Sequence, residues 1–301
     1  MTRFIKKSAF LSAIIILTGI YTASAQEGLH ARIATISKEA KGIVGVSVLN
    51  IETHDTLNYN ANAQLVMQSV MKFPLAMAVL HLVDSGVYTL NQTIHIKKHD
   101  MDGNLESVLR QKYPDGGDVS LSELLSDMIS QSDNVACDVL LAQLGGPQQV
   151  DNYLRSIKIR GINLAASEAE QSGPKNWQVQ YTNWCKPLDM VRLLRSFYAG
   201  KALQPGSREF LYKLMTETTT GPNRIKALLP QGTVVAHKTG SSGTNDEGLS
   251  PATNDVGIIT LPNGHHVAIA ILVCNSTADE ATREGVIAKI AKAVYDDAVS
   301  K

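Results

Sequence analysis

Several features that would point to a metal centre, a redox enzyme or a nucleic-acid-binding protein are missing from this sequence. Neither a C-x-x-C nor an H-E-x-x-H pattern occurs in its 301 residues, so the common motifs for thiol redox chemistry and zinc-dependent hydrolysis are absent. The 28 basic residues are balanced by 28 acidic ones, which argues against a strongly basic surface for nucleic acid or an anionic membrane. We therefore expect no metal site, no nucleic-acid partner and no stable membrane association.

Long hydrophobic runs are also absent, apart from one near the N-terminus. The first 25 residues contain no acidic residue and three basic ones, Arg3, Lys6 and Lys7. The apolar run 9–20 that follows is too short to span a bilayer easily, and Ala23-Ser24-Ala25 fits an A-x-A cleavage site. We predict that residues 1–25 are a secretory signal peptide and that the mature protein begins at Gln26 in the periplasm. An uncleaved anchor is the alternative.

Cysteine is scarce. Cys137, Cys185 and Cys274 make an odd number for an exported protein. Cys137 and Cys274 lie in apolar stretches, which favours buried thiols; one disulfide among the three is the alternative. His265-His266 follow Pro-Asn-Gly at 262–264, a hairpin-turn signal, so this histidine pair indicates a turn rather than a metal site.

The predicted secondary structure places strands at both ends of the sequence and helices between them. Strands are predicted at 43–50, 56–60, 233–238, 255–261 and 267–274, and helices at 30–41, 120–129, 187–198 and 277–299. The simplest assembly is an α/β (α+β) fold: an antiparallel sheet built from both chain ends, flanked by helices, with an all-helical domain inserted. We expect residues 26–65 and 218–301 to form the α/β domain and residues 66–217 the all-helical domain.

Three short motifs carry the chemical information. Ser69-Val70-Met71-Lys72 places a hydroxyl and an amine three residues apart at the start of an apolar run, and positions i and i+3 share one face of a helix. A serine becomes an effective nucleophile when a neighbouring base activates it. Ser132-Asp133-Asn134 and Lys238-Thr239-Gly240 follow in that order. The trio is a known signature of serine enzymes that react with penicillin.

Pro74 would clash with a carbonyl in a regular helix, so we expect a distortion or a helix boundary near it.

The motifs and their flanks resemble those of class A serine β-lactamases over nearly the whole mature length. The local sequence is most similar to that of the extended-spectrum branch that includes the PER enzymes, in the stretches SVMKFP (69–74), SDNVACD (132–138), TTTGP (218–222) and VVAHKTG (234–240). The resemblance implies a penicillin-binding-protein-like fold and an enzyme that confers resistance by hydrolysing the amide of β-lactam substrates. It also implies that no cofactor is needed, and we expect a monomer.

The resemblance assigns roles to the first two motifs. Ser69 is the nucleophile that forms the acyl-enzyme, and Lys72 relays or accepts its proton. Ser132 passes a proton to the leaving lactam nitrogen. Asn134 offers its amide to the side chain of the substrate. Asp133, between them, is expected to be a structural hydrogen-bond acceptor.

The third motif and one arginine are assigned to substrate binding. Lys238 supplies positive charge and Thr239 a hydroxyl for the substrate carboxylate, while Gly240 allows close approach to the backbone. Ser241 provides the second N–H of the oxyanion hole by family position. Arg224 is proposed to reach the same carboxylate; a surface arginine is the alternative.

A long stretch without clear periodicity, residues 160–184, is identified as the omega loop of this family. The family uses a glutamate in this loop to activate water for deacylation. Glu168 fits that position best and Glu170 is the rival, while Ser172 replaces the asparagine that usually holds the water. Glu106 aligns where many relatives carry an aromatic residue.

Two other functions share the trio: a D-Ala-D-Ala peptidase or penicillin-binding protein, and a penicillin-sensing domain that stays acylated. The glutamate of the omega loop argues against the first. The sensor normally continues from a membrane-signalling region, which we do not expect for this protein. The sequence leaves open the substrate spectrum, inhibitor sensitivity and whether Lys72 or Glu168 is the acylation base.

Overall fold

The computed structural model describes residues 28–103, 105–172 and 177–301. The predicted signal peptide, residues 1–25, lies outside this part of the chain, as do residues 173–176 of the predicted omega loop. Within the described residues, no helix is long and apolar enough to cross a membrane.

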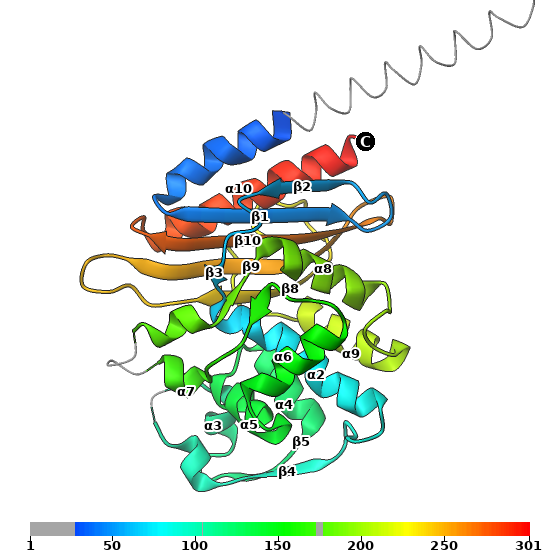
Figure 1. The fold of residues 1–301 in the computed structure, drawn as a ribbon, viewed down its shortest axis with the longest axis vertical. Helices are drawn as coiled ribbons and strands as arrows, with labels where there is room; N and C mark the ends of the chain where they lie inside the picture. The colour runs from blue at the N-terminus through cyan, green and yellow to red at the C-terminus, as the bar shows by residue number, and fades with distance from the viewer. Residues whose placement is uncertain (1–27, 104, 173–176) are drawn as a thin grey trace, which may run out of the picture.

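A five-stranded antiparallel sheet joins the two ends of the sequence (Figure 1). Its strands, in spatial order, are β2 (Thr56–Tyr59), β1 (Ile43–Asn50), β10 (His266–Ser276), β9 (Ser250–Thr260) and β8 (Val235–Ser241). β1 and β2 form the predicted hairpin. β9 and β10 form another around the predicted turn, with His266 opposite Thr260. The predicted fold class is confirmed.

Alternation along β10 divides the apolar interior into two cores. Odd-numbered residues from Val267 to Val273 enter one core, and even-numbered residues from Ala268 to Cys274 enter the other. This is the two-residue period of a strand that is covered on both faces. The sheet is therefore the middle layer of the molecule.

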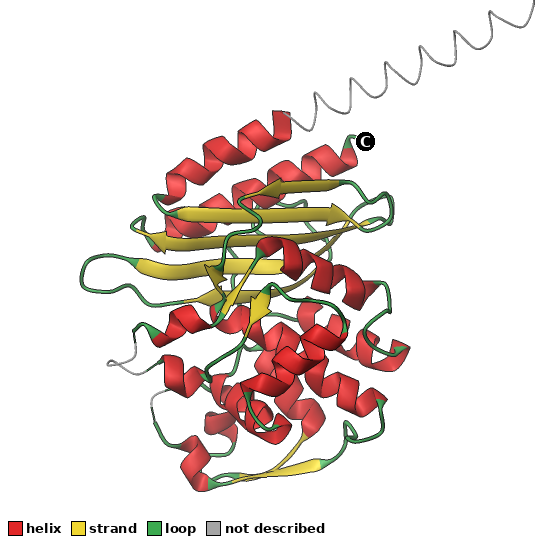
Figure 2. Cartoon of the chain, viewed as in Figure 1, coloured by secondary structure: helices red, strands yellow, loops and turns green. Residues whose placement is uncertain are grey.

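Helices cover both faces of the sheet (Figure 2). On one face lie the helix formed by residues 28–37, the short 3-10 helix η1 (Lys38–Ala40) and α10 (Glu280–Val299), with Ile33 and Ile287 in their shared core. On the other face α8 (Pro187–Tyr198) packs against β1 and β10. A Cβ at Gly45 would lie 2.9 Å from the Pro187 side chain, so the glycine permits this close approach.

The middle of the sequence forms a helical region beneath the sheet (Figure 1). Its longer helices are α2 (Lys72–Asp84), α4 (Leu121–Ser130), α5 (Asn134–Leu144), α6 (Pro147–Ser156) and α9 (Pro205–Thr216). Every residue of α2 from Lys72 to Leu80 is buried, as expected for a helix that is apolar all round. The shorter helices are α3 (Val108–Lys112), α7 (Glu168–Gln171) and the 3-10 helices η2 (Gln68–Met71), η3 (Lys98–Met101) and η4 (Val179–Thr182).

Short strands interrupt this region, and the sequence analysis did not predict them. β4 (Thr93–Ile96) pairs with β5 (Gly117–Ser120), and β7 (Trp184–Cys185) lies between β3 (Leu65–Val66) and β6 (Ile162–Asn163). Two- and four-residue strands are too short for a recognisable period. The boundaries of β8 also differ from the prediction, because pairing with β9 continues to Ser241. The whole Lys238-Thr239-Gly240 motif therefore lies within an edge strand.

Candidate active site

Ser69 and Lys72 lie on either side of a junction between two kinds of helix. Ser69 belongs to the 3-10 helix η2, and Lys72 is the first residue of α2. Pro74 is the third residue of α2, where a missing N–H breaks no intrahelical bond. The predicted helix boundary near Pro74 is confirmed, and it separates the turn that carries the hydroxyl from the helix that carries the amine.

The side-chain nitrogen of Lys72 connects four of the predicted site residues. Its Nζ donates to Ser69 Oγ at 3.0 Å and lies 3.0 Å from Glu168 Oε1. It also donates to the Asn134 side-chain oxygen and, at 2.7 Å, to the Ser132 carbonyl. Lys72 is 0% exposed. A buried cation requires such partners, so this set of polar groups holds the amine beside the Ser69 hydroxyl.

The Ser132-Asp133-Asn134 motif forms the entry into α5. Ser132 adopts a left-handed backbone with φ of 59°, a conformation that costs a non-glycine residue about 1–2 kcal/mol. Asp133 is buried and caps α5 by accepting from Ala136 N at 2.8 Å. It also accepts from Leu109 N and Ser107 Oγ, so it is the structural acceptor that the sequence predicted.

Lys238 contacts the same motif from the opposite wall. Its Nζ donates to Ser132 Oγ at 2.8 Å and to the Thr239 carbonyl at 3.0 Å. Burial, followed by the charge of Lys72, lowers the pKa of Lys238 well below its ordinary value. The two lysines thus lie on opposite sides of the Ser132 hydroxyl.

The free edge of β8 faces Ser69. Val234 O and Ser242 N bond across to β9, and antiparallel pairing alternates along a strand. The backbone groups of Thr239 and Ser241 therefore point away from β9, toward η2. A Cβ at Gly240 would lie 2.3 Å from the Met67 carbonyl. The close approach that needs this glycine is thus with the backbone of the Ser69 turn.

Arg224 lies behind the same strand and is only 4% exposed. Its Nε donates to Glu284 at 2.9 Å, and its Nη2 donates to Ser241 Oγ at 2.6 Å. Nη1 donates to the carbonyls of Gly240 and Asn254. The guanidinium lines the active-site cavity, so the alternative of a surface arginine is wrong.

The predicted omega loop brings Glu168 into the site and leaves Glu170 outside. Glu168 is 4% exposed, and its Oε1 accepts from Ser69 Oγ at 3.3 Å. Glu170 is exposed and turns back to accept from Ser167 N at 2.8 Å. Ser172 is exposed, and its hydroxyl donates to the Glu168 carbonyl at 2.7 Å. The structure therefore places Ser172 against the backbone of the loop.

The cavity at this site has a volume of about 660 Å³. Seven of the predicted site residues line it: Ser69, Ser132, Asn134, Arg224, Thr239, Gly240 and Ser241. Glu106 also lines the cavity. The site is thus a cavity lined by the Ser69 and Ser132 hydroxyls, with the buried Lys72, Lys238 and Glu168 in contact with them.

Comparison with known proteins agrees with this geometry. The model of the β-lactamase enzyme family matches residues 28–298, and the chain is 36% identical over 301 residues to the β-lactamase VEB-1 of Pseudomonas aeruginosa, covering 99% of this chain and 100% of the relative. The chain belongs to the β-lactamase enzyme family. It is also 39% identical to the extended-spectrum β-lactamase PER-1 of Pseudomonas aeruginosa, over 91% of this chain and 88% of the relative.

Solved β-lactamase structures have the same fold. The crystal structure of the TLA-1 extended-spectrum β-lactamase matches with a TM-score of 0.89 and 46% identity, covering 91% of this chain and 99% of that chain. These comparisons confirm the predicted resemblance to the extended-spectrum class A branch. The protein is a class A β-lactamase, an enzyme of antibiotic resistance.

Two polar residues that the sequence analysis missed hold the omega loop of this β-lactamase. Asp138 accepts from Glu168 N at 2.7 Å and Ala169 N at 2.9 Å. Asn183 is fully buried and bonds with the backbone of Ala165 and Ala166. Asp138 lies in the SDNVACD stretch, one helical turn after Asn134, which is the signal that would have identified it.

All three cysteines of the β-lactamase are buried free thiols, which confirms the preferred prediction over a disulfide. Burial raises the pKa of the Cys137 thiol well above its ordinary value, so this thiol stays protonated and does not compete with Ser69 as a nucleophile.

Asp138 gives the β-lactamase a pH-dependent contact. Burial raises the pKa of its carboxyl from 3.8 to about 6, and each of its oxygens accepts one backbone N–H. Below pH 6 one oxygen carries a proton and is a poorer acceptor. We expect Asp138→Asn, which also keeps only one acceptor oxygen, to lower kcat/KM about tenfold at pH 7.5, since one hydrogen bond to a charged group is worth about 1.5–3 kcal/mol. The loss should shrink toward pH 5, as shown by pH profiles of both enzymes.

The raised pKa also has a defined consequence for stability. Because the Asp138 carboxyl binds its proton more tightly in the folded protein than in the unfolded chain, protonation of this group stabilises the fold. This contribution is fully present below the unfolded pKa of about 3.8 and is lost as the pH rises through about 6. Between pH 4 and 7 the free energy of unfolding of the parent should therefore fall by at most about 3 kcal/mol relative to that of Asp138→Asn. The fall is smaller where solvent screens the carboxylate. Urea unfolding at several pH values measures this difference. A difference that does not change with pH would contradict the assignment.

Proposed function

We propose that this β-lactamase works through an acyl-enzyme on Ser69 that water activated by Glu168 hydrolyses. The observation that carries the proposal is the contact of one buried oxygen, Glu168 Oε1, with both Ser69 Oγ at 3.3 Å and Lys72 Nζ at 3.0 Å. A nucleophile, a base and a cation that orients both are the parts that acyl transfer requires.

In the acylation step, Ser69 Oγ attacks the lactam carbonyl and its proton leaves to a neighbouring base. Ser69 Oγ donates to Glu168 and accepts from Lys72, which supports Glu168 as the first proton acceptor and Lys72 as the group that orients the hydroxyl. The carbonyl oxygen becomes an oxyanion, for which the backbone N–H groups of Ser69 and Ser241 are the proposed donors. The Ser241 N–H on the free edge of β8 supports this role.

When the lactam C–N bond breaks, the nitrogen takes a proton. Ser132 Oγ is the proposed source, because it lies between Lys238 at 2.8 Å and Lys72 at 3.4 Å. Either ammonium can return a proton to the Ser132 hydroxyl. The lowered pKa of Lys238 makes its ammonium a stronger acid, which supports this lysine as a source of that proton.

Deacylation follows from the loss of the Ser69 proton. The proton that Glu168 took from Ser69 passes by way of Lys72, 3.0 Å from Glu168 Oε1 and 3.4 Å from Ser132 Oγ, to replace the one that Ser132 gave to the lactam nitrogen. The ester oxygen of an acylated Ser69 has no hydrogen to donate to Glu168, so the regenerated carboxylate becomes available to a water molecule. Glu168 removes a proton from that water, which attacks the ester carbonyl, and the proton passes to Ser69 Oγ as the product leaves. Asp138 and Asn183 support this step by holding the backbone that carries Glu168.

We propose that Thr239, Ser241 and Arg224 bind the substrate carboxylate together. Thr239 Oγ1 is 2.6 Å from Thr220 Oγ1, and Ser241 Oγ accepts from Arg224, so both hydroxyls are held on the same edge of the cavity. Much of the effect of Arg224 is expected to act through Ser241, because Glu284 and two carbonyls occupy the rest of the guanidinium.

Arg224→Ala is expected to lower kcat/KM about ten- to a hundredfold, because a charge-assisted hydrogen bond is worth about 1.5–3 kcal/mol. Removing one partner of a buried ion pair also destabilises the fold. The double variant Arg224→Ala/Glu284→Gln is the control, since it removes the unpaired charge as well. If the double variant regains the parent's kcat/KM, the loss of activity in Arg224→Ala came from the buried and unpaired carboxylate of Glu284. Arg224 would then not assist binding of the substrate carboxylate.

A time course with a chromogenic cephalosporin tests the hydrolytic mechanism. We expect sustained turnover of many equivalents per enzyme, with a transient covalent adduct on Ser69 by mass spectrometry. A single stoichiometric burst would instead describe a sensor or a transpeptidase.

We further propose that the enzyme acts in the periplasm. The support is the pattern of residues 1–25, with its basic start, short apolar run and Ala23-Ser24-Ala25 site. Intact-mass analysis of the periplasmic protein is expected to give a chain that begins at Gln26. A full-length chain recovered from the inner membrane would contradict this proposal.

A further inference from the structure

A second cavity lies on another side of β8 and shares no lining residue with the active-site cavity. Its volume is about 840 Å³, within the range of pockets that hold small organic ligands. One wall is the exposed face of α9, and the other is the segment 233–235 that leads into β8. Tyr198, at the end of α8, and Lys226 complete the lining.

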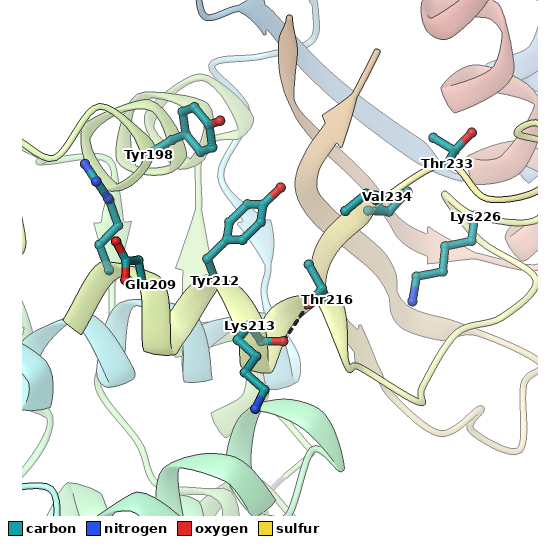
Figure 3. Close-up of a pocket in the computed structure, with 10 residues that line it drawn as sticks. Tyr198, Glu209, Tyr212, Lys213, Thr216, Lys226, Thr233 and Val234 are labelled. Carbon is teal, nitrogen blue, oxygen red and sulfur yellow. Dashed lines mark hydrogen bonds between the residues drawn. The ribbon is translucent and has the colours of Figure 1, made fainter. Parts of the chain in front are cut away.

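Aromatic and aliphatic groups form the central part of this cavity. Figure 3 shows Tyr212 between Tyr198 on one side and Thr216 and Val234 on the other. The rings of Tyr198 and Tyr212 lie 5.8 Å apart with an interplanar angle of 58°. Val234 is 47% exposed, so it offers apolar surface to the cavity. A planar apolar group would cover this surface from water.

The charged residues around the aromatic pair are mainly basic. Arg208, Lys213 and Lys226 line the cavity together with a single acid, Glu209. Lys213 is paired with Glu217 at 3.8 Å. Among the described residues, neither Arg208 nor Lys226 has a carboxylate oxygen within 4 Å. Lys226 Nζ donates to the Thr218 carbonyl at 3.2 Å, which leaves further N–H groups of the ammonium for a ligand.

We propose that this cavity binds a small aromatic anion, a ring system that bears one carboxylate or sulfonate. The ring would pack on Tyr212 and Val234, and the acid group would pair with Lys226. Figure 3 shows Lys226 across the cavity from the two tyrosines, so one ligand spans both the apolar surface and the cation. An uncharged ring leaves the Lys226 ammonium without an anionic partner, and a purely inorganic anion leaves the apolar surface exposed.

The test uses two dyes that differ in one charge. Anilinonaphthalene sulfonate supplies aromatic rings and a sulfonate, and N-phenylnaphthylamine supplies similar rings without the acid. Fluorescence titration of the full mature enzyme, with stoichiometry by calorimetry, is expected to show saturable binding of the sulfonate at one site. Lys226→Gln should weaken the sulfonate about tenfold and leave the uncharged dye within twofold. Tyr212→Leu should weaken both dyes.

Two control variants separate this cavity from other surfaces. Lys213→Gln removes a cation that is 71% exposed and already paired, so sulfonate affinity should stay within twofold. Thr239→Val alters the active-site cavity and should likewise have no effect on the dyes. The proposal is overturned if Lys226→Gln leaves sulfonate binding unchanged, or if Thr239→Val abolishes it. The Lys226→Gln comparison decides the matter even if Tyr212→Leu fails to fold, as judged by its thermal midpoint.

Discussion

Replacing Ser69 with alanine is expected to lower kcat/KM for β-lactam hydrolysis by at least about 10⁴-fold, since removal of a nucleophile in a cooperating catalytic group leaves only binding and oxyanion stabilisation. The fold should be retained. The Ser69 hydroxyl contributes one donor and one acceptor to Glu168 and Lys72, and these two groups also contact each other at 3.0 Å. Steady-state kinetics and a thermal melt of the purified variant measure both expectations.

A neighbouring hydroxyl gives the matched control. Ser242 lies just beyond the Lys238-Thr239-Gly240 motif, and its Oγ contacts the Ala252 carbonyl and Ser250. Ser242→Ala should change kcat/KM by less than about fivefold, because the hydrogen bonds lost are with Ala252 and Ser250 on β9 and not with Ser69 or Lys72. Substantial turnover by Ser69→Ala, with no covalent adduct on the parent enzyme, would rule out the serine mechanism.

Glu168→Gln is expected to trap the acyl-enzyme. The amide keeps the shape of the side chain and an oxygen that accepts from Lys72, but it has no basic carboxylate to remove a proton from water. General-base catalysis contributes about 10²–10⁴-fold, so hydrolysis of the ester should slow by that order. Acylation should slow less, since Lys72, 3.0 Å from Ser69 Oγ, can accept the serine proton in place of Glu168. Intact-mass spectrometry with a slow substrate should then show the adduct on Ser69 after minutes.

Glu170→Gln is the control for this experiment, because it alters a carboxylate two residues away in the same loop. Glu170 is exposed and accepts from Ser167 N, a bond that the glutamine oxygen can also make. We expect this variant to keep turning over without an accumulated adduct. Exchanged phenotypes would identify Glu170 as the base, and an adduct in neither variant would remove the omega loop from the deacylation step.

The elements that the sequence predicted well have strong local signals. The helix predicted at 187–198 was found with both ends correct as α8, because it begins with a proline at its first position and keeps its apolar residues on one face. The hairpins at β1–β2 and β9–β10 were likewise visible as valine- and isoleucine-rich runs separated by turn residues. β4 and β5 were missed because each is four residues long, and their pairing joins segments about twenty residues apart.

The sequence by itself determined the family, the fold class and the three motifs that meet in the cavity. The reason is that residue types and the order of motifs can be read from the sequence without knowing any distance in the fold. Tertiary structure alone decided which carboxylate reaches Lys72 and what surrounds Arg224. Glu168 and Glu170 have the same chemistry and nearly the same local sequence. Hydrogen bonds that the carboxylate of Asp138, on α5, accepts from Glu168 N and Ala169 N fix the backbone that points Glu168 inward. The partner of Arg224 is Glu284, sixty residues away on α10. Such contacts depend on how distant elements pack, and no local pattern records them.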